Sequence, residues 1–265
     1  MDKNLYAEER KFKILKFLSE RKKVSVIDLA ASLGVTATTI RTDLRDLESG
    51  NFLLRTHGGA IEKPHTGFES KLREREVENR VQKQRIAELA LRQIENGDTI
   101  LLDTGTTLRE LARLLHQRTR LTVVTNDLAI VEILEEMPGI VVVVLGGTLR
   151  KGFQCTLGTF TQFGAMKLAV DKGFFGANGF SLEAGATTPD LGQAEVKQRM
   201  LTMVQKVFLL CDHTKIGHAC FAQFASVDRI DTLITDTLDE PMRKAFHERD
   251  VEFLEAVAEP SPERN

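Results

Sequence analysis

Cysteines are few in this sequence of 265 residues, and long apolar runs are absent. The three cysteines, Cys155, Cys211 and Cys220, form no C-x-x-C pair, and an odd, sparse set is typical of reduced thiols in a cytoplasm. The stretch MDKNLYAEERKFKILKFL has neither an apolar core nor a small-residue cleavage site, so we expect no secretory signal peptide. The most apolar stretch, GIVVVVLGG, has the length of a strand and is too short to cross a bilayer. The sequence therefore predicts a cytoplasmic protein without a membrane span.

A strong net charge is also lacking, since 36 Lys and Arg against 38 Asp and Glu give −2. The balance is uneven along the chain. Residues 1–63 contain 12 basic against 9 acidic side chains, and the remainder contains 24 against 29. A basic N-terminal segment is a weak indication of a polyanionic partner. The hydrophobic content of 42% is ordinary for a globular protein, and the length suits one large domain or two unequal ones.

The N-terminal segment carries the signals of two successive helices. Residues 5–18 place apolar side chains at helical spacing and predict an amphipathic helix. Ser25 is expected to cap a second helix, VIDLAASL, with Asp28 three residues on completing a capping-box-like pair. Gly34 then ends that helix as a typical C′ residue.

A third helix and a hairpin are expected next. Thr36 is placed to cap the helix TATTIRTDLRDLE, and Gly50 to end it. The stretch FLLRTHGGAI contains two short extended pieces around HGG, which is a hairpin signal. Helix, helix, short turn, helix and hairpin is the order of a winged helix-turn-helix unit. In such units the second helix of the pair lies in the DNA major groove.

The third helix has two unlike faces. Ile40, Leu44 and Leu47 recur at i, i+4 and i+7, which predicts a stripe buried on a small core. Another face carries hydroxyl and guanidinium groups suited to bases or phosphates: Thr38, Arg41, Thr42 and Arg45. With the capped first turn, whose amides suit a phosphate, and the wing, the predicted DNA-binding residues are Ser25, Thr36, Ala37, Thr38, Thr39, Arg41, Thr42, Arg45, Arg55 and His57. The alternatives are a solvated face on a small bundle, or a winged helix that binds protein.

A linker composition, EKPHTG, separates this segment from the rest. The predicted parts of the chain are a winged helix-turn-helix domain at 1–62, a connector at 63–80, an α/β domain at 81–258 and a flexible tail at 259–265. The connector contains the charge-rich stretch ESKLREREVENRVQKQR. That stretch is either a solvated helix or the covalent route that couples the two domains.

The second half alternates apolar strands with helices, from GDTILLDTG through IDTLITD as the last strand. Such alternation favours an α/β domain with a mostly parallel sheet covered on both faces. Ligands of these sheets bind beyond the carboxyl ends of the strands. The polar strand ends here are Asp103 to Thr107, Thr125-Asn126, Gly146-Gly147, Gly176 to Gly179 and Asp212 to Lys215.

The first strand end, DTGTT, leads directly into a helix and therefore presents amides and two hydroxyls at a helix N-terminus. That arrangement predicts a phosphate cradle, with Lys215, Lys83 or Lys197 supplying counter-charge. It is neither a Walker A loop nor a G-x-G-x-x-G fingerprint. The alternative is a tight, well-capped turn without a ligand.

Both halves resemble the DeoR family of bacterial sugar-operon repressors. RKFKILKFLSERKKVSVIDLAASLGVTATTIRTDLRDLESGNFLLRTHGGAI is similar to the family's DNA-binding domain. GDTILLDTGTT, LTVVTN, VLGG, FFGANGF and LLCDHTKIG are similar, in order, to its sensor domain. The family usually has two adjacent arginines in TIRRDL, whereas Thr42 stands second here, which puts any borrowed operator sequence in doubt. The resemblance implies a sensor fold similar to ribose-5-phosphate isomerase and CoA-transferases.

The resemblance also implies a phosphorylated sugar or related metabolite as effector. Phosphate contacts would come from Gly105, Thr106 and Thr107, with sugar or charge contacts from Asp103, Asn126, Lys197, Asp212 and Lys215. The whole predicted effector set is Lys83, Asp103, Gly105, Thr106, Thr107, Asn126, Gly146, Gly147, Gly176, Lys197, Asp212 and Lys215. Because DNA-binding units of this size work in pairs on two half-sites, we expect a homo-oligomer, a dimer or tetramer.

A sugar-phosphate isomerase fused to a winged helix is the enzyme alternative. Isomerisation needs a carboxylate base, and the loop GANGF offers none, although Glu183 and Glu195 lie nearby in the sequence. We therefore expect no catalytic residues and no cofactor. The group Cys211, His213, His218 and Cys220 matches no usual zinc spacing, so no metal site is expected either.

Overall fold

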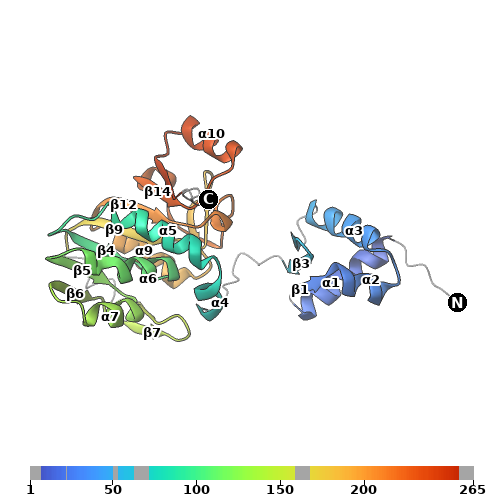
Figure 1. The fold of residues 1–265 in the computed structure, drawn as a ribbon, viewed down its shortest axis with the longest axis horizontal. Coiled ribbons are helices and arrows are strands. Elements are labelled where there is room, and N and C mark those ends of the chain that lie inside the picture. Colours follow the sequence, from blue (N-terminus) through green and yellow to red (C-terminus); the bar gives the residue numbers. More distant parts are fainter. Residues whose placement is uncertain (1–6, 22, 50–52, 63–71, 159–167, 257–265) are drawn as a thin grey trace, which may run out of the picture. The chain divides into compact units, whose positions relative to one another are not determined.

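A computed structural model describes residues 7–21, 23–49, 53–62, 72–158 and 168–256. The chain divides into two compact units, Met1–His65 and Thr66–Asn265. The elements of each unit are labelled in Figure 1. The predicted linker EKPHTG after its first residue, the helix end at Gly50 and the tail from 259 lie outside the described residues. In the described part of the chain, every helix is too short or too polar to cross a membrane.

The first unit is a winged helix-turn-helix, as the order of signals predicted. Its elements are α1 (Ala7–Arg21), β1 (Lys23–Ser25), α2 (Val26–Leu33), α3 (Ala37–Ser49), β2 (Leu53–Thr56) and β3 (Gly59–Glu62). The hairpin β2–β3 is confirmed, and β1 adds a third antiparallel strand beside β3. Strand β1 was not predicted, because three residues between two helices carry no periodicity.

Local capping sets the helix boundaries of this unit. The Ser25 Oγ accepts a hydrogen bond from the Asp28 amide at 3.0 Å. Gly34 ends α2 with a left-handed backbone, φ 68°, which glycine adopts without steric cost. The Thr36 Oγ1 accepts from the Thr39 amide at 3.2 Å. The three caps read from the sequence are thus confirmed.

The predicted stripe of α3 is the centre of the small core. Ile40, Leu44 and Leu47 are at most 5% exposed and pack with Ile14 and Leu18 of α1. Burial of such a side chain is worth roughly 1.5–3 kcal/mol. The stripe therefore fixes which face of α3 is left to solvent.

The second unit is an α/β domain built on one large sheet. Its helices are α4 (Leu72–Val77), α5 (Arg80–Leu91), α6 (Thr106–Leu114), α7 (Leu128–Glu135), α9 (Leu191–Leu201) and α10 (Glu240–Glu248). Short 3₁₀ turns are η1 (Leu115–Gln117), η2 (His213–Lys215) and η3 (Val227–Arg229). The strands of the large sheet are β4 (Thr99–Leu102), β5 (Leu121–Thr125), β6 (Ile140–Val144), β9 (Val170–Gly176), β12 (Val204–Leu210), β14 (Thr232–Thr235) and β15 (Phe253–Glu255).

The order of these strands creates a switch point. The sheet runs β15-β14-β12-β9-β4-β5-β6, and every neighbouring pair is parallel. The chain extends the sheet from β4 toward β6, and then returns to β9 and extends it in the opposite direction. The strand order therefore reverses between β4 and β9, and ligands of open α/β sheets bind at such a reversal.

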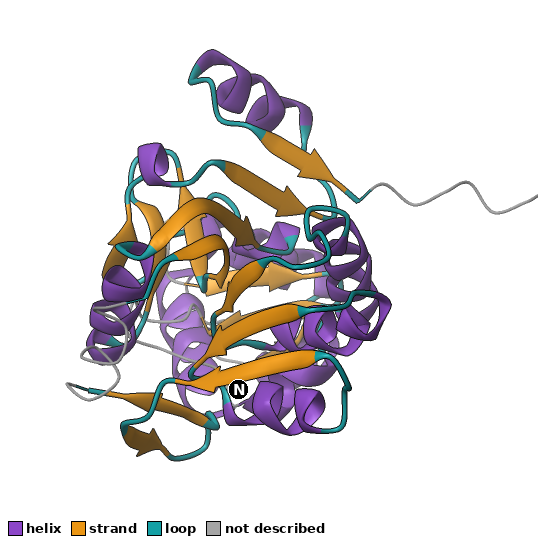
Figure 2. Ribbon diagram, turned by 90° about the vertical axis from the view of Figure 1, so that its left-hand side faces the viewer, coloured by secondary structure: helices purple, strands orange, loops and turns teal. Residues whose placement is uncertain are grey.

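Two apolar cores cover the two faces of the large sheet. Figure 2 shows this sheet together with the helices that pack on it. Helices α5, α6 and α7 pack on one face, and α9, α10 and a small second sheet pack on the other. The mostly parallel, doubly covered sheet is confirmed. Parallel strands buried on both faces read as continuous apolar runs, and KVFLLCD is such a strand, whereas the equally apolar GIVVVVLGG forms the partly exposed edge strand β6.

Several short elements were not predicted. Antiparallel strands form two small sheets, β7 (Thr148–Arg150) with β8 (Cys155–Leu157), and β10 (Gly179–Ser181) with β11 (Gly185–Thr188) and β13 (Ala222–Ala225). Strand β15 follows β14, so IDTLITD is not the last strand. The charge-rich connector stretch forms two helices, α4 and α5, because Asn79 between them has a left-handed backbone, φ 51°.

Candidate functional site

The solvent face of α3 carries the polar residues that the sequence predicted for DNA. Thr38, Arg41, Thr42 and Arg45 are all exposed. The Thr42 Oγ1 donates to the Thr38 carbonyl at 3.2 Å, within the helix. Two arginines and two short hydroxyls on one helical face leave room for a close approach to a phosphate backbone. Of the other residues predicted there, Thr36 is exposed, and Ser25, Ala37 and Thr39 are half-buried.

The wing is linked to α3 by one side chain. Arg55 of β2 donates its backbone amide to the Glu48 Oε1 at 3.0 Å, and its guanidinium lies 3.5 Å from the Glu48 Oε2. His57 is exposed at the hairpin turn. A second link, between the Arg10 guanidinium and the 3% exposed Asp43 at 2.6 Å, holds α3 to α1. The α3 helix is thus held by one largely buried ion pair to α1 and by one exposed pair to the wing.

A cavity opens in the second unit at the switch point, beyond the carboxyl ends of β4, β9 and β12. Its lining residues are Arg75, Glu78, Lys83, Thr104, Gly105, Thr106, Thr107, Leu108, Gly176, Ala177, Asn178, Gln193, Lys197, Leu210, Cys211, Asp212 and Lys215. Four cationic side chains against two carboxylates make the lining positive.

The loop between β4 and α6 forms the floor of this cavity. Gly105 has φ 144°, a conformation that L side chains rarely adopt, so glycine is needed for this turn. The first amides of α6 have no intrahelical acceptor and suit an anion. The Gly105 amide itself donates to the Asp127 Oδ2 at 3.2 Å, and Thr104 Oγ1 donates to the same oxygen at 2.8 Å. Asp127 thus shapes the cradle from behind.

Lys197 of α9 is the most buried cation of the cavity, with a side chain 4% exposed. Its ammonium pairs with the Asp103 Oδ2 and donates to the Gly176 carbonyl at 2.8 Å. The Gly176 amide donates to the same Asp103 oxygen at 3.0 Å. The ends of β4 and β9 are therefore joined at the switch point through one carboxylate and one ammonium.

Lys83, Asp212 and Lys215 complete the polar wall. Burial lowers the pKa of the Lys83 ammonium, against the opposing effect of nearby Asp212. The Asp212 Oδ1 accepts from the Asn79 amide group at 3.1 Å. Lys215 forms no salt bridge with a described residue, so its charge is available to a ligand.

The predicted effector residues divide into two groups. Eight line the cavity: Lys83, Gly105, Thr106, Thr107, Gly176, Lys197, Asp212 and Lys215. Four do not: Asp103, Asn126, Gly146 and Gly147. Asp103 lies one ion pair behind Lys197, and the Asn126 Nδ2 donates to the Thr156 carbonyl at 2.8 Å. Gly146 and Gly147 follow the edge strand β6, which lies two strands from the switch point.

Sequence reasoning missed Asp127 and Arg109. Asp127 is fully buried and forms an ion pair with the 4% exposed Arg109 at 3.1 Å. A signal existed for Asp127, because an aspartate between a strand and a helix is a typical N-cap, and its Oδ1 does accept from the Ala129 amide at 2.9 Å. Nothing in the sequence distinguishes Arg109 from a surface arginine of an amphipathic helix.

The residues behind the enzyme and metal alternatives lie outside the cavity, except Cys211, which lines it. Glu183 and Glu195 are exposed and do not line the cavity. Cys211 is buried in the core, and burial raises the pKa of its thiol to about 12. The His213 Nδ1 is hydrogen-bonded to the Asp236 Oδ2 at 2.7 Å.

Comparisons with known proteins agree with this architecture. Residues 10–64 match the family model of the DeoR-like helix-turn-helix domain, and residues 78–237 match that of the DeoR C-terminal sensor domain. The chain is 35% identical to the HTH-type transcriptional regulator GlpR of Haloferax volcanii, covering 94% of this chain and 98% of that protein. It is 28% identical to the glycerol-3-phosphate regulon repressor of Escherichia coli, covering 84% and 88%.

Among solved structures, ribose 5-phosphate isomerase A of Methanocaldococcus jannaschii is similar over 52% of this chain and 55% of its own. The identity is 18% and the TM-score 0.39. The two family models together span the winged helix and most of the α/β domain, and the curated relatives are regulators rather than enzymes. The chain therefore belongs to the DeoR family of DNA-binding transcriptional regulators.

Proposed function

We propose that this regulator represses a carbohydrate-metabolism operon, and that a phosphorylated sugar or related metabolite bound in the second unit changes its operator affinity. The observation that carries the proposal is the positive cavity at the switch point, with the DTGTT cradle on its floor. The name of the Escherichia coli relative, a glycerol-3-phosphate regulon repressor, supports a phosphorylated effector.

The composition of the cavity supports an anion with polar groups attached. Amides and hydroxyls of Thr106 and Thr107 suit a phosphate, and Lys215, which forms no salt bridge with a described residue, adds a positive charge to the lining. Asp212 and Asn178 offer acceptors and a donor for hydroxyl groups. A phosphorylated polyol satisfies both ends of this cavity, whereas an apolar ligand would leave the charges unpaired.

The predicted domain boundaries, DNA contacts and oligomer belong to the same proposal. The winged-helix domain at 1–62 binds the operator through the exposed α3 face and the wing. The connector at 63–80 joins it to the sensor domain at 81–258. Two or four copies present paired winged helices to two half-sites, as units of this size require. Such a regulator acts in the cytoplasm, where both DNA and phosphorylated sugars occur.

The test is a thermal-unfolding titration of the full chain with sugar phosphates, the matching unphosphorylated sugars and inorganic phosphate. A ligand that binds only the folded state raises Tm with its concentration. We expect at least one sugar phosphate to raise Tm while its unphosphorylated sugar does not. Lys215→Ala should weaken the shift, and Lys206→Ala, which removes an exposed lysine outside the cavity, should leave it unchanged.

The same ligand should then change the affinity for operator DNA selected from a random pool. A Tm shift without any change in DNA affinity would contradict the effector role. An equal shift with the unphosphorylated sugar would contradict the phosphate reading of the cradle.

A further inference from the structure

Helix α4 forms part of the cavity wall and also begins the second unit in the described chain. Arg75 of α4 and Glu78 just after it line the cavity. Leu72 is 7% exposed and anchors the start of the helix. The chain before Leu72 leads to the winged-helix unit, so α4 is the first element of the sensor domain that this connection reaches.

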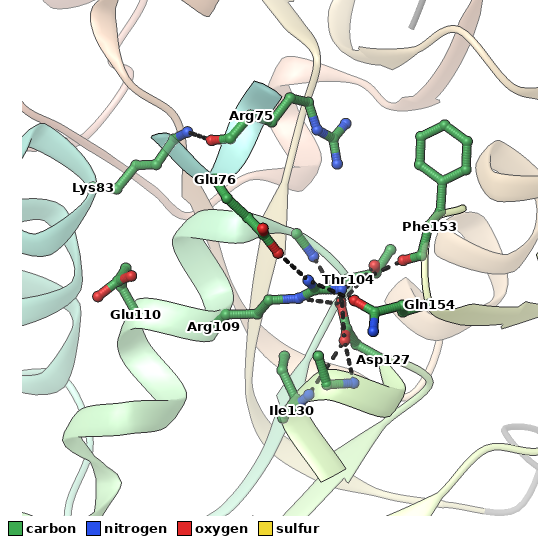
Figure 3. Close-up of polar contacts among 12 residues, drawn as sticks. Arg75, Glu76, Lys83, Thr104, Arg109, Glu110, Asp127, Ile130, Phe153 and Gln154 are labelled. Atoms are coloured by element: carbon green, nitrogen blue, oxygen red, sulfur yellow. Dashed lines mark hydrogen bonds and ion pairs between the residues drawn. The ribbon is translucent and has the colours of Figure 1, made fainter. Parts of the chain in front are cut away.

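One set of contacts ties α4 to the floor of the cavity, and Figure 3 shows it. The Arg109 Nη1 donates to the Glu76 Oε1 at 3.1 Å, and its Nη2 donates to the Asp127 Oδ1 at 3.1 Å. Asp127 in turn accepts from Thr104 and Gly105 of the cradle loop. The cradle and α4 are therefore linked in series through Asp127, Arg109 and Glu76.

The Arg109 guanidinium also donates to the Gln154 Oε1 at 3.1 Å and to the Phe153 carbonyl at 3.4 Å. Its bonds to Asp127 and to Glu76 differ in strength. Asp127 is fully buried, and it accepts hydrogen bonds from backbone amides and a hydroxyl besides the guanidinium. Breaking such a pair leaves an uncompensated buried charge. The Glu76 side chain is 46% exposed, and water competes for exposed pairs, which are weak. Any movement of α4 therefore breaks the bond to Glu76 first.

A second tie runs through Lys83 of α5. Its ammonium donates to the carbonyls of Arg75 and, at 2.6 Å, Glu78, and so caps the C-terminal end of α4. Lys83 also lines the cavity. An anion in the cavity competes for this ammonium, because hydrogen bonds between two charged groups are stronger than those to neutral carbonyls.

We propose that α4 is the element that reports occupancy of the cavity. Without a ligand, Lys83 and the Glu76–Arg109 pair hold α4 against the sensor domain. An anion takes the Lys83 ammonium and shifts the cradle loop, and α4 loosens from the sensor domain. Glu76 is thus a positioning residue that does not itself line the cavity. The inference rests on the proposed binding of an anionic ligand there.

The test is hydrogen–deuterium exchange of the full chain, read by mass spectrometry at residues 72–79 and 104–108. Inorganic phosphate serves as the anion probe. Without phosphate, Glu76→Ala should speed exchange of α4 several-fold. Glu76→Gln should do so less, because its amide oxygen still accepts from Arg109. Glu74→Ala, which removes an exposed carboxylate from the same helix, should have no effect.

With phosphate, the wild-type protein should gain protection at 104–108 and lose it at 72–79. In Glu76→Ala the gain at 104–108 should persist and the further loss at 72–79 should shrink, which a merely structural role of Glu76 would not produce. Protection at 104–108 with α4 unchanged would overturn the inference and leave the proposed function standing. No protection at 104–108 would overturn the anion site and the inference with it. If the exchange rate of α4 in Glu76→Ala equalled that of the wild type, the role of the Glu76–Arg109 bond would be overturned.

Discussion

At the scale of single residues, the buried ammonium of Lys197 at the cavity is matched by a buried carboxylate. Lys197 and Asp103 are 4% and 1% exposed, and the pair joins α9 to the end of β4. Lys197 also lies over the Phe224 ring, with its ammonium 4.9 Å from the ring centroid. Taking two charges out of water is costly unless both partners are present, so the pair is more sensitive to the loss of one member than of both.

Asp103→Ala should therefore destabilise the folded chain by about 3 kcal/mol or more, because it leaves the Lys197 ammonium buried without a carboxylate. Urea unfolding measures this change as a lower midpoint at unchanged slope. The double variant Asp103→Leu with Lys197→Met should recover part of the loss. A single variant as stable as the wild type would show that Lys197 reaches solvent.

Arg41 is the residue-scale test of the proposed DNA-binding face. Arg41→Ala should weaken DNA binding and lower the slope of log affinity against log salt by about 1, if the guanidinium neutralises one phosphate. Fluorescence anisotropy at several salt concentrations gives both quantities. Arg85→Ala, which removes an exposed arginine of α5, is the charge-matched control. A loss of affinity with an unchanged slope would indicate a base contact instead.

At the scale of elements, α10 is tied to the edge strand β15 by a side-chain pair. The Arg243 guanidinium donates to both Glu255 oxygens, at 2.9 and 3.0 Å, and the Leu238 amide donates to the Glu255 Oε1 at 2.9 Å. These bonds, first of all the one from Arg243, lower the pKa of Glu255 below its ordinary value of 4.5. The pair holds an outer helix and an edge strand together.

A lowered carboxyl pKa makes this contribution depend on pH. The stabilisation is fully present above the unfolded-state value near 4.5. It is lost as pH falls through the lower pKa of the folded state. Glu255→Gln should therefore lose less stability than the wild type between neutral pH and pH values below 4.5, measured by urea unfolding at each pH. Glu252→Gln, an exposed neighbour on the same segment, should behave as the wild type. Equal acid sensitivity in Glu255→Gln would contradict the pair.

The whole molecule combines a small DNA-binding unit with a larger sensor of opposite net charge. Residues 1–63 carry an excess of three positive charges and the rest an excess of five negative charges. The proposed homo-oligomer would present two winged helices to two half-sites, because a single winged helix contacts only one short half-site.

DNA selected from a random pool by the full chain should accordingly contain two related half-sites at a constant spacing. Mutating one half-site should weaken binding much more than tenfold at physiological salt, since linked sites bind far more tightly than one site alone. Sedimentation of the complex gives the number of chains per DNA. Selection of a single isolated half-site, bound by one chain, would contradict the paired arrangement.

The sequence predicted local features correctly wherever a single residue type determines the backbone conformation or the buried face of an element. Ser25, Gly34 and Thr36 marked helix boundaries, and Ile40, Leu44 and Leu47 marked the buried face of α3, because caps and periodicities act within a few residues. The split of the connector at Asn79 and the short antiparallel strands were not readable. A single left-handed residue and three-residue strands depend on distant neighbours rather than on local preference.

The sequence by itself determined the two kinds of unit, the polar face of α3, and the residue types that follow each strand, since all of these depend on neighbours along the chain. The tertiary structure decided which strand ends meet. The reversal of strand order between β4 and β9 brings the ends of β4, β9 and β12 around one cavity, and leaves Asn126, Gly146 and Gly147 outside it. It also decided that Arg109 lies buried between Asp127 and Glu76. The physical reason is that burial and charge pairing join residues far apart in the sequence, and no local pattern records such contacts.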